Sequence, residues 1–227
     1  MKRRVWLGLV AVLSIGVGLV APLPWLLGLV EPTPGGMPLG AHLFERFTAA
    51  QLVFVAHVGG GGLALVVGPW QLMKRMRRRW PRLHRATGYV YVAAVAVGGT
   101  AGLVLGPTAW AGPIAQAGFT ALAIAWLATT ALGVQRILSG DRTGHRAWMT
   151  RSFALAFAAV SLRIQFPLFA AIGLPAAVGY TIVAWSSWLP NLVVAHVVLA
   201  RRNSAGETPV HRRNARVNEL CSENPSR

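Results

Sequence analysis

The sequence predicts an all-α membrane protein, a polytopic bundle of six transmembrane helices. Three observations predict this fold class. The mean hydropathy is +0.51 and only 12% of the 227 residues are charged, too few to keep a soluble domain of this length dispersed. Apolar residues gather into long runs, and the basic residues fall almost entirely between those runs. We expect the bundle to cover residues 1–200 and a polar, disordered tail to cover residues 201–227.

Six segments have the length that a bilayer requires. A hydrocarbon core about 30 Å thick needs about 20 helical residues, and a helix pairs its backbone polar groups internally. Prolines and glycines separate the segments, and we expect none of the conspicuous interruptions found in many transporters. The predicted spans are Val5–Leu29, Thr48–Met73, Ala86–Leu105, Ile114–Leu138, Trp148–Ile172 and Ala176–Ala200.

The distribution of Lys and Arg predicts the orientation of these spans. Basic residues precede the first span, fill the connection from Lys74 to Arg85, and recur between the fourth and fifth spans and after the sixth. The opposite connections hold only Arg46. Because insertion retains Lys and Arg on the cytoplasmic side, both termini are predicted to be cytoplasmic and the loop with His42, Glu45 and Arg46 to be external. We expect a multi-pass protein of the bacterial inner membrane.

The net charge of +16 has a membrane explanation. A pI near 11.9 would ordinarily suggest nucleic-acid binding, but a nucleic-acid-binding domain has no need of several apolar segments of spanning length. Basic residues beside such segments follow from the orientation rule and attract anionic lipid headgroups, so we expect the bilayer and anionic lipids as partners. Cys221 is the one cysteine, so any haem would have to be held noncovalently.

Two ionisable residues stand out because they lie deep within predicted spans, in about the same layer. His57 and Arg163 each lie roughly three residues outward of the middle of their helix. No Asp or Glu occurs in any span, so Arg163 must be balanced by carbonyl groups, a water-filled cavity or a bound anion. We expect a cavity or a ligand; the alternative is that Arg163 extends outward to the membrane surface. The glycines at 59–62 would admit either a neighbouring helix or a flat ligand.

A second polar group lies at the predicted cytoplasmic rim. Neutral imidazoles on different helices can form an axial pair for haem iron, for which His84 and His145 are the candidates. The alternative, favoured on sequence alone, is that these residues anchor the helix ends in the headgroup region. The group comprises His84, Arg85, His145, Arg146, Arg151 and His196.

Several short motifs resemble a family of bacterial membrane proteins. The motifs are HVGGGGLALVVGPWQ from His57 to Gln71, LHRATGYVY from Leu83 to Tyr91, GF at Gly118 and Phe119, HRAWMTRSFAL from His145 to Leu155, and LR at Leu162 and Arg163. Together they resemble the family called domain of unknown function 2306. The likeness covers about His57 to Arg163, within a core of about residues 48–172, and leaves the first and last spans outside.

The family is named for its lack of an established activity, so the resemblance implies little about function. Its spaced histidines are similar to those of transmembrane b-type cytochromes, in which histidines on facing helices hold haem. By that analogy the histidines would ligate iron, and the arginines would contact propionates or quinone oxygens. At most one haem is expected, because the outer layer offers a single histidine. The candidate cofactor-binding residues are His57, His84, His145, Arg85, Arg151 and Arg163.

Three functions stay open on the sequence. The first is a redox protein that binds one b-type haem and passes electrons between a quinone, or a protein partner, and an acceptor. The second is a small permease or channel for an anion or a proton, with Arg163 and His57 lining a central cavity. The third is a noncatalytic accessory or assembly subunit of a membrane complex. No Ser-His-Asp set, HExxH motif or P-loop indicates hydrolysis, and whether the protein is an enzyme stays undecided.

Overall fold

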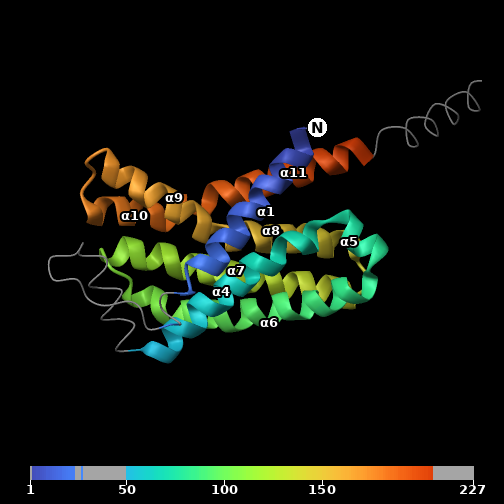
Figure 1. Ribbon diagram of the computed structural model, residues 1–227, viewed down its shortest axis with the longest axis horizontal. Helices are drawn as coiled ribbons and strands as arrows, with labels where there is room; N and C mark the ends of the chain where they lie inside the picture. The colour runs from blue at the N-terminus through green and yellow to red at the C-terminus, as the bar shows by residue number, and fades with distance from the viewer. Residues whose placement is uncertain (1, 24–26, 28–49, 207–227) are drawn as a thin grey trace, which may run out of the picture. The chain divides into compact units, whose positions relative to one another are not determined.

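The computed structural model describes residues 2–23, 27 and 50–206, with side chains at residue 5 and from residue 8 to residue 201 of these ranges. The described chain is helical and contains no strand, which confirms the all-α prediction (Figure 1). The described residues divide after Leu192, within the last helix, into two compact units, a larger and a smaller one. The elements are α1 (Lys2–Val20), α4 (Gln51–Leu72), α5 (Lys74–Arg79), α6 (Pro81–Leu105), η1 (Gly106–Thr108), α7 (Pro113–Leu138), α8 (Arg142–Ala156), α9 (Ala158–Ala171), α10 (Ala176–Ser186) and α11 (Leu189–Gly206).

Five helical segments in the described part are long and apolar enough to cross a membrane. They also carry large apolar side chains on their outer faces, where Leu52 and Leu138 are 82% and 81% exposed. Such surfaces are unfavourable in water and suited to lipid, so the chain is a membrane protein. The five segments are Gln51–Leu72, Pro81–Thr108, Pro113–Leu138, Arg142–Ala171 and Ala176–Arg201.

The predicted first span and the predicted orientation remain predictions. The apolar stretch described in α1 is the shorter Gly8–Val20, and part of the expected span Val5–Leu29 lies outside the described residues. The loop with His42, Glu45 and Arg46 also lies outside them, as do residues 207–227 of the predicted tail. Five of the six expected spans are therefore described as helices of spanning length.

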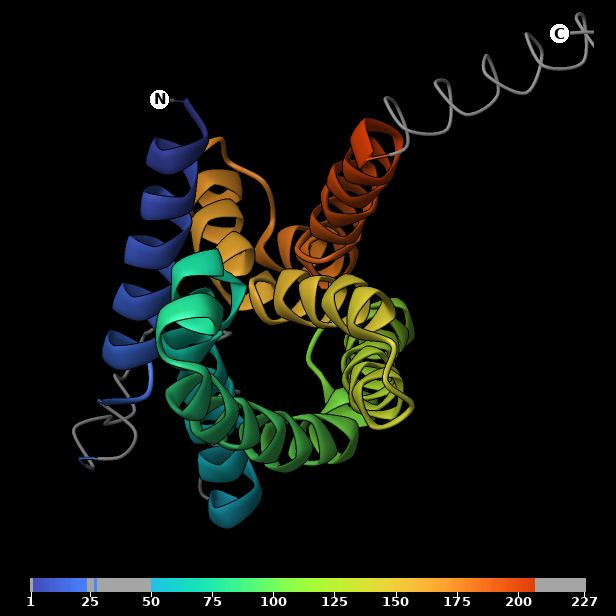
Figure 2. The same cartoon turned by 90° about the vertical axis from the view of Figure 1, so that its right-hand side faces the viewer.

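Within the larger unit, helices α4, α6, α7 and α8 follow one another around a ring (Figure 2). α4 packs mainly against α6, α6 against α7 and α7 against α8, and α8 returns to α4. Tyr91, Val95 and Leu155 are fully buried between them. α1 packs on α4, and α10 packs on α7 and α9. This arrangement places α4 and the α8–α9 segment on two sides of the same interior.

Glycines set the distance between α4 and its neighbours. A Cβ atom on Gly60 would lie 2.7 Å from the backbone nitrogen of Gly98 on α6. A Cβ atom on Gly62 would lie 2.6 Å from the carbonyl oxygen of Gly18 on α1. Both distances are too short for a carbon atom, so these contacts admit only glycine without displacing a helix. Two of the four glycines after His57 therefore serve helix packing, one of the two alternatives that the sequence left open.

The last two spans each contain a short break that was not predicted, although each remains long enough to cross a membrane. One break falls at Phe157, between α8 and α9, and the other between α10 and α11. At the second break Pro190 has no N–H to offer the Ser186 carbonyl, and the Gln165 side chain donates to that carbonyl at 3.2 Å. The indole N–H of Trp188 similarly donates to its own helix, at 2.8 Å from the Ala184 oxygen. Side chains thus satisfy backbone groups that a regular helix would pair, which lets the break persist in the membrane.

Candidate functional site

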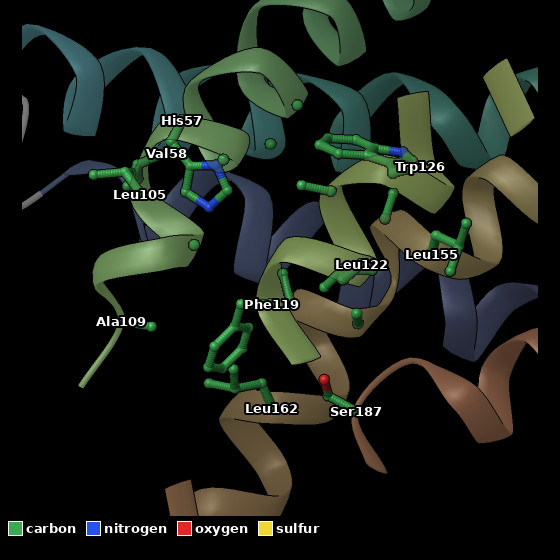
Figure 3. Close-up of a pocket in the computed structure, with 18 of the residues that line it drawn as sticks. His57, Val58, Leu105, Ala109, Phe119, Leu122, Trp126, Leu155, Leu162 and Ser187 are labelled. Carbon is green, nitrogen blue, oxygen red and sulfur yellow. The ribbon is translucent and has the colours of Figure 1, made fainter. Parts of the chain in front are cut away.

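A cavity of about 410 Å³ lies between α4, α6, α7 and the two interrupted spans. Its wall is mainly apolar and includes Tyr180. The rings of Phe119 and Trp126 also line it (Figure 3). Its volume falls within the range of about 300–1,000 Å³ that is usual for small-molecule sites. Among its lining residues are two of the predicted site residues, His57 and Arg163. The two predicted residues therefore lie on the wall of the same cavity, where both could contact one bound molecule.

His57 projects from α4 into the cavity with its imidazole held in a defined orientation (Figure 3). Its Nδ1 lies 2.9 Å from the carbonyl oxygen of Gly98 on α6. Because a carbonyl only accepts, Nδ1 carries the proton and donates, and the neutral ring keeps its lone pair on Nε2. Gly102 makes room for this ring, since a Cβ there would lie 3.1 Å from Nδ1. Nδ1 of His57 thus joins α4 to α6 through a hydrogen bond, and Nε2 remains able to accept one.

Arg163 lines the same cavity from α9 and belongs to its polar part. Its guanidinium donates to the Ala159 carbonyl one turn earlier, at 2.9 Å. The one Asp or Glu among the described residues is Asp141, which pairs with Arg136 at 3.4 Å in the α7–α8 connection. Arg163 is therefore an exposed cation at the wall of the cavity that no carboxylate of the described chain neutralises.

Ser187 adds a hydroxyl that was not among the predicted site residues. It lines the cavity at the break between α10 and α11, and its side-chain oxygen faces the cavity side of Leu162 and Phe119 (Figure 3). The oxygen is fully buried and has no hydrogen-bond partner among the described residues. A buried hydroxyl is unfavourable without a partner, so a ligand that offers one would gain from it. The signal in the sequence was Pro190, which marks the break.

The other four candidate residues lie away from this cavity, and none of them lines it. Gln71, whose amide contacts the His84 ring, comes fourteen residues after His57 in α4, a separation of about 21 Å along the helix. The six candidates are therefore not brought together in one site. His196, which was also predicted at the rim, lies in the smaller unit. The four residues outside the cavity are His84, Arg85, His145 and Arg151.

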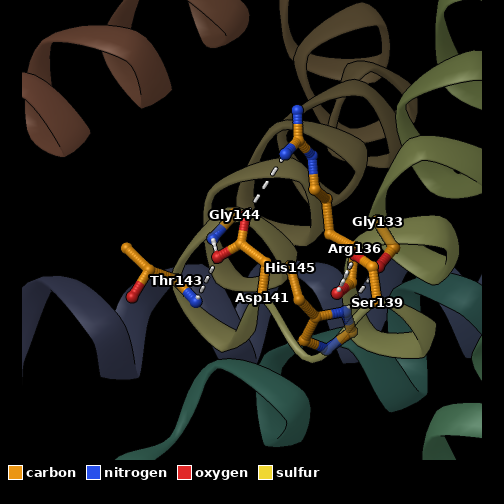
Figure 4. A network of polar contacts seen from close by, with 7 residues as sticks. All are labelled: Gly133, Arg136, Ser139, Asp141, Thr143, Gly144 and His145. Carbon is orange, nitrogen blue, oxygen red and sulfur yellow. Dashed lines mark hydrogen bonds and ion pairs between the residues drawn. The ribbon is translucent and has the colours of Figure 1, made fainter.

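His145 holds α8 against α7. Its Nδ1 donates to the carbonyl oxygen of Gly133 at 2.7 Å, so the neutral ring has the same tautomer as His57. It follows the turn at Asp141, whose carboxylate caps α8 by accepting from the backbone N–H groups of Thr143 and Gly144 at 3.1 and 2.8 Å (Figure 4). Its role in this arrangement is to join two helices, with Nε2 left as an acceptor.

The two arginines of this group differ in their surroundings. The guanidinium of Arg151 lies over the ring of Trp148, 4.9 Å from its centroid, in a cation–π contact. Arg85 is exposed near the start of α6. Both positions agree with the anchoring interpretation, in which basic and aromatic side chains hold helix ends at the membrane surface.

His84 has the opposite hydrogen-bond arrangement to the other two histidines. The Gln71 amide satisfies its neighbours when its oxygen accepts from the Gly88 N–H at 3.2 Å and its nitrogen donates to His84 Nδ1 at 2.7 Å. Nδ1 is then an acceptor, and the neutral ring carries its proton on Nε2. An imidazole binds iron through a lone pair, so His84 in this arrangement is not prepared for axial ligation by Nε2.

A buried chain of hydroxyls links three helices of the ring. The hydroxyl of Tyr91 on α6 lies 2.9 Å from that of Ser152 on α8, which lies 2.7 Å from that of Thr130 on α7. Thr130 in turn donates to the Trp126 carbonyl at 2.8 Å. Because the chain ends on a carbonyl, its donors all point one way, from Tyr91 to Thr130. The chain satisfies three hydroxyls in the core and leaves none of them to a ligand.

A family match covers most of the described chain. Residues 54–199 match the family described as "Predicted membrane protein (DUF2306)". The match reaches beyond Arg163, so the expectation that the last span falls outside the family was wrong. Tyr180 and Ser187 of that span line the cavity. No curated protein and no solved structure matches the chain.

Proposed function

The chain belongs to the DUF2306 family of predicted membrane proteins. From that premise we propose that its cavity binds a quinone-type molecule, which exchanges electrons with a membrane-protein redox partner. One observation carries the proposal: His57 and Arg163 lie on the wall of one mainly apolar cavity. A quinone headgroup is flat and largely apolar, with a carbonyl oxygen on each of two edges. Such a molecule needs apolar walls and a few directed polar groups.

The two ionisable side chains have complementary abilities toward such a headgroup. The guanidinium of Arg163 donates hydrogen bonds and stabilises negative charge on a quinone oxygen, which increases as the ring is reduced. The lone pair on Nε2 of His57 accepts a proton from a quinol hydroxyl, while the bond to Gly98 holds the ring in place. Ser187 offers a third polar contact. The rings of Phe119 and Tyr180 provide surfaces against which a flat ring packs.

The proposal is tested by binding of a short-chain quinone to the purified full-length chain in detergent, measured by isothermal titration calorimetry. Replacing Arg163 by leucine removes the charged donor and is expected to weaken binding by about tenfold to a hundredfold. Arg151→Leu is the matched control, because Arg151 lies over Trp148 and does not line the cavity. The proposal fails if folded wild-type protein binds no quinone, or if the two variants lose the same affinity.

A b-type haem is the second candidate, and one observation favours it. His145 donates through Nδ1 to the Gly133 carbonyl, the arrangement usual for histidines that bind metal through Nε2. His84 would have to change its hydrogen bond with Gln71 to supply the second ligand. Neither ring lines the cavity. His84 contacts Gln71, which lies most of a membrane span away from His57 along α4. A bound haem would supply one-electron chemistry, and the residues fit it less well than they fit a quinone.

Absorbance distinguishes the two candidates. Protein purified from cells supplied with haem precursor would show a Soret band if His84 and His145 hold haem, and His145→Ala would abolish the band. Colourless, folded protein that binds quinone would exclude the haem and leave the first candidate standing.

We also propose that the protein lies in the bacterial inner membrane with both termini in the cytoplasm. The alternation of basic and uncharged connections supports this orientation. Reporter fusions within the Lys74–Arg85 connection test it. A periplasmic signal from that connection would reverse the orientation and place the cavity nearer the opposite membrane surface.

A further inference from the structure

The short helix α5 presents a dense positive surface. Its sequence is KRMRRR, and the side chain of Met76 is buried while those of Lys74, Arg75, Arg78 and Arg79 are exposed. Residues four apart share a helix face, so two like-charge pairs stand side by side there, which destabilises the helix. A helix of six residues is also unstable in isolation. The burial of Met76 holds α5 in place while its charges repel one another.

The described chain offers no carboxylate to offset these charges. Asp141 is the one acidic residue in the described ranges, and it pairs with Arg136 at 3.4 Å in a different connection. Arg77 differs from its neighbours, because its guanidinium donates to the Gln71 carbonyl oxygen at 3.4 Å. Any anion that pairs with the exposed residues of α5 therefore comes from outside the described residues.

An apolar groove of about 690 Å³ adjoins the basic helix. It lies between the end of α4, α5 and the start of α6, and Arg75 belongs to its wall. Trp70 and Trp80, also in the wall, are 45% and 48% exposed. Tryptophan rings with one open face are typical of the boundary between headgroups and acyl chains. The other lining residues are Val66, Val67, Met73, Met76, Leu83 and Thr87.

We propose that this groove is a binding site for one anionic phospholipid, with an acyl chain against Trp70 and Trp80 and the phosphate on the basic face of α5. Charge complementarity selects an anionic headgroup, and the apolar wall selects a molecule that carries a chain. A free phosphate would leave the groove open, whereas a phospholipid occupies both parts. The site is independent of the proposed quinone cavity, because the two share no lining residue.

The headgroup is tested with the full-length chain in detergent, mixed with phosphatidylglycerol or phosphatidylcholine of identical acyl chains. Bound lipid is counted by native mass spectrometry. We expect phosphatidylglycerol to bind more tightly, and Arg75→Gln with Arg79→Gln to weaken it by about 30-fold. Arg142→Gln with Arg146→Gln removes the same charge from the first turns of α8 and should change binding little. Equal affinity for the two lipids, or equal losses in the two double variants, would overturn the proposal.

The acyl chain is tested with phosphatidylglycerol brominated along one chain, because bromine quenches the fluorescence of nearby tryptophans. Wild-type fluorescence should fall on titration, and the combined Trp70→Phe and Trp80→Phe variant should lose most of that quenching. Unchanged quenching in this variant would contradict the groove assignment. Displacement of the bound lipid by an equal concentration of soluble glycerol 3-phosphate would show that the groove contributes nothing, and would also overturn the proposal.

Discussion

Histidines occur in two regions of the bundle, and the two regions differ in how their polar groups are hydrogen-bonded. At the cavity, one ring nitrogen of His57 is hydrogen-bonded to a backbone carbonyl. Arg163 contributes a positive charge to the same wall, and Ser187 contributes a hydroxyl without a hydrogen-bond partner among the described residues. Near the α4–α6 and α7–α8 connections, His84 and His145 are bonded to neighbouring helices and line no part of that space. The number of histidines therefore does not locate a site. What locates it is which polar groups remain able to bind something else.

The largest effect on the cavity is expected from separating α4 and α6, the two helices whose contact orients His57. Gly60→Ala would bring a Cβ within 2.7 Å of the Gly98 nitrogen, push α4 from α6 and lengthen the bond from His57 to the Gly98 carbonyl. We expect a loss of about 1–3 kcal/mol in unfolding free energy and a loss of quinone binding. Thermal unfolding in detergent and calorimetry measure the two effects.

Gly59→Ala is the matched control for this substitution. A Cβ on Gly59 meets nothing within 4 Å, so the same added methyl group should leave the unfolding temperature unchanged or slightly raised. Equal destabilisation by the two neighbouring changes would mean that the close α4–α6 contact is not what requires glycine at residue 60, since alanine has the higher helix propensity.

A crossed pair of substitutions sharpens the contrast between the two regions. His57→Ala removes the proposed proton acceptor and should weaken quinone binding by about tenfold. His145→Ala removes the bond to the Gly133 carbonyl and should cost about 1–2 kcal/mol of stability with quinone affinity unchanged. Each variant is measured in both assays. Loss of quinone affinity in the His145 variant alone would reverse the assignment of the two regions.

The sequence predicts the outline of this molecule better than its interior. Helix type and five of the spans follow from runs of apolar residues, because the bilayer imposes one length and one backbone solution on each of them. The pairing of His57 with Arg163 in one layer also followed, from counting residues along two helices. These features depend on local pattern and on a fixed membrane thickness.

The parts that were missed depend on contacts between distant segments. His57 can hydrogen-bond to the Gly98 carbonyl because glycines allow close contact between α4 and α6. No sequence feature near residue 98 indicates that contact. The break beside Ser187 persists because Gln165, from the preceding span, bonds the carbonyl that Pro190 leaves open. His84 and His145 looked equivalent in sequence, and only their partners distinguish the two tautomers.

The smallest expected effect comes from Ser187→Ala, and it separates a ligand-binding hydroxyl from a structural one. The hydroxyl has no partner among the described residues, so its removal should change the unfolding free energy by less than about 0.5 kcal/mol or raise it slightly. Quinone affinity, in contrast, should fall about threefold to tenfold if the bound molecule bonds this oxygen. Ser152→Ala provides the opposite control, because the Ser152 hydroxyl bonds both Tyr91 and Thr130 and lies away from the cavity wall. If the Ser187 variant loses stability but keeps its quinone affinity, the hydroxyl has a structural role. The polar contacts proposed for the quinone would then come from His57 and Arg163.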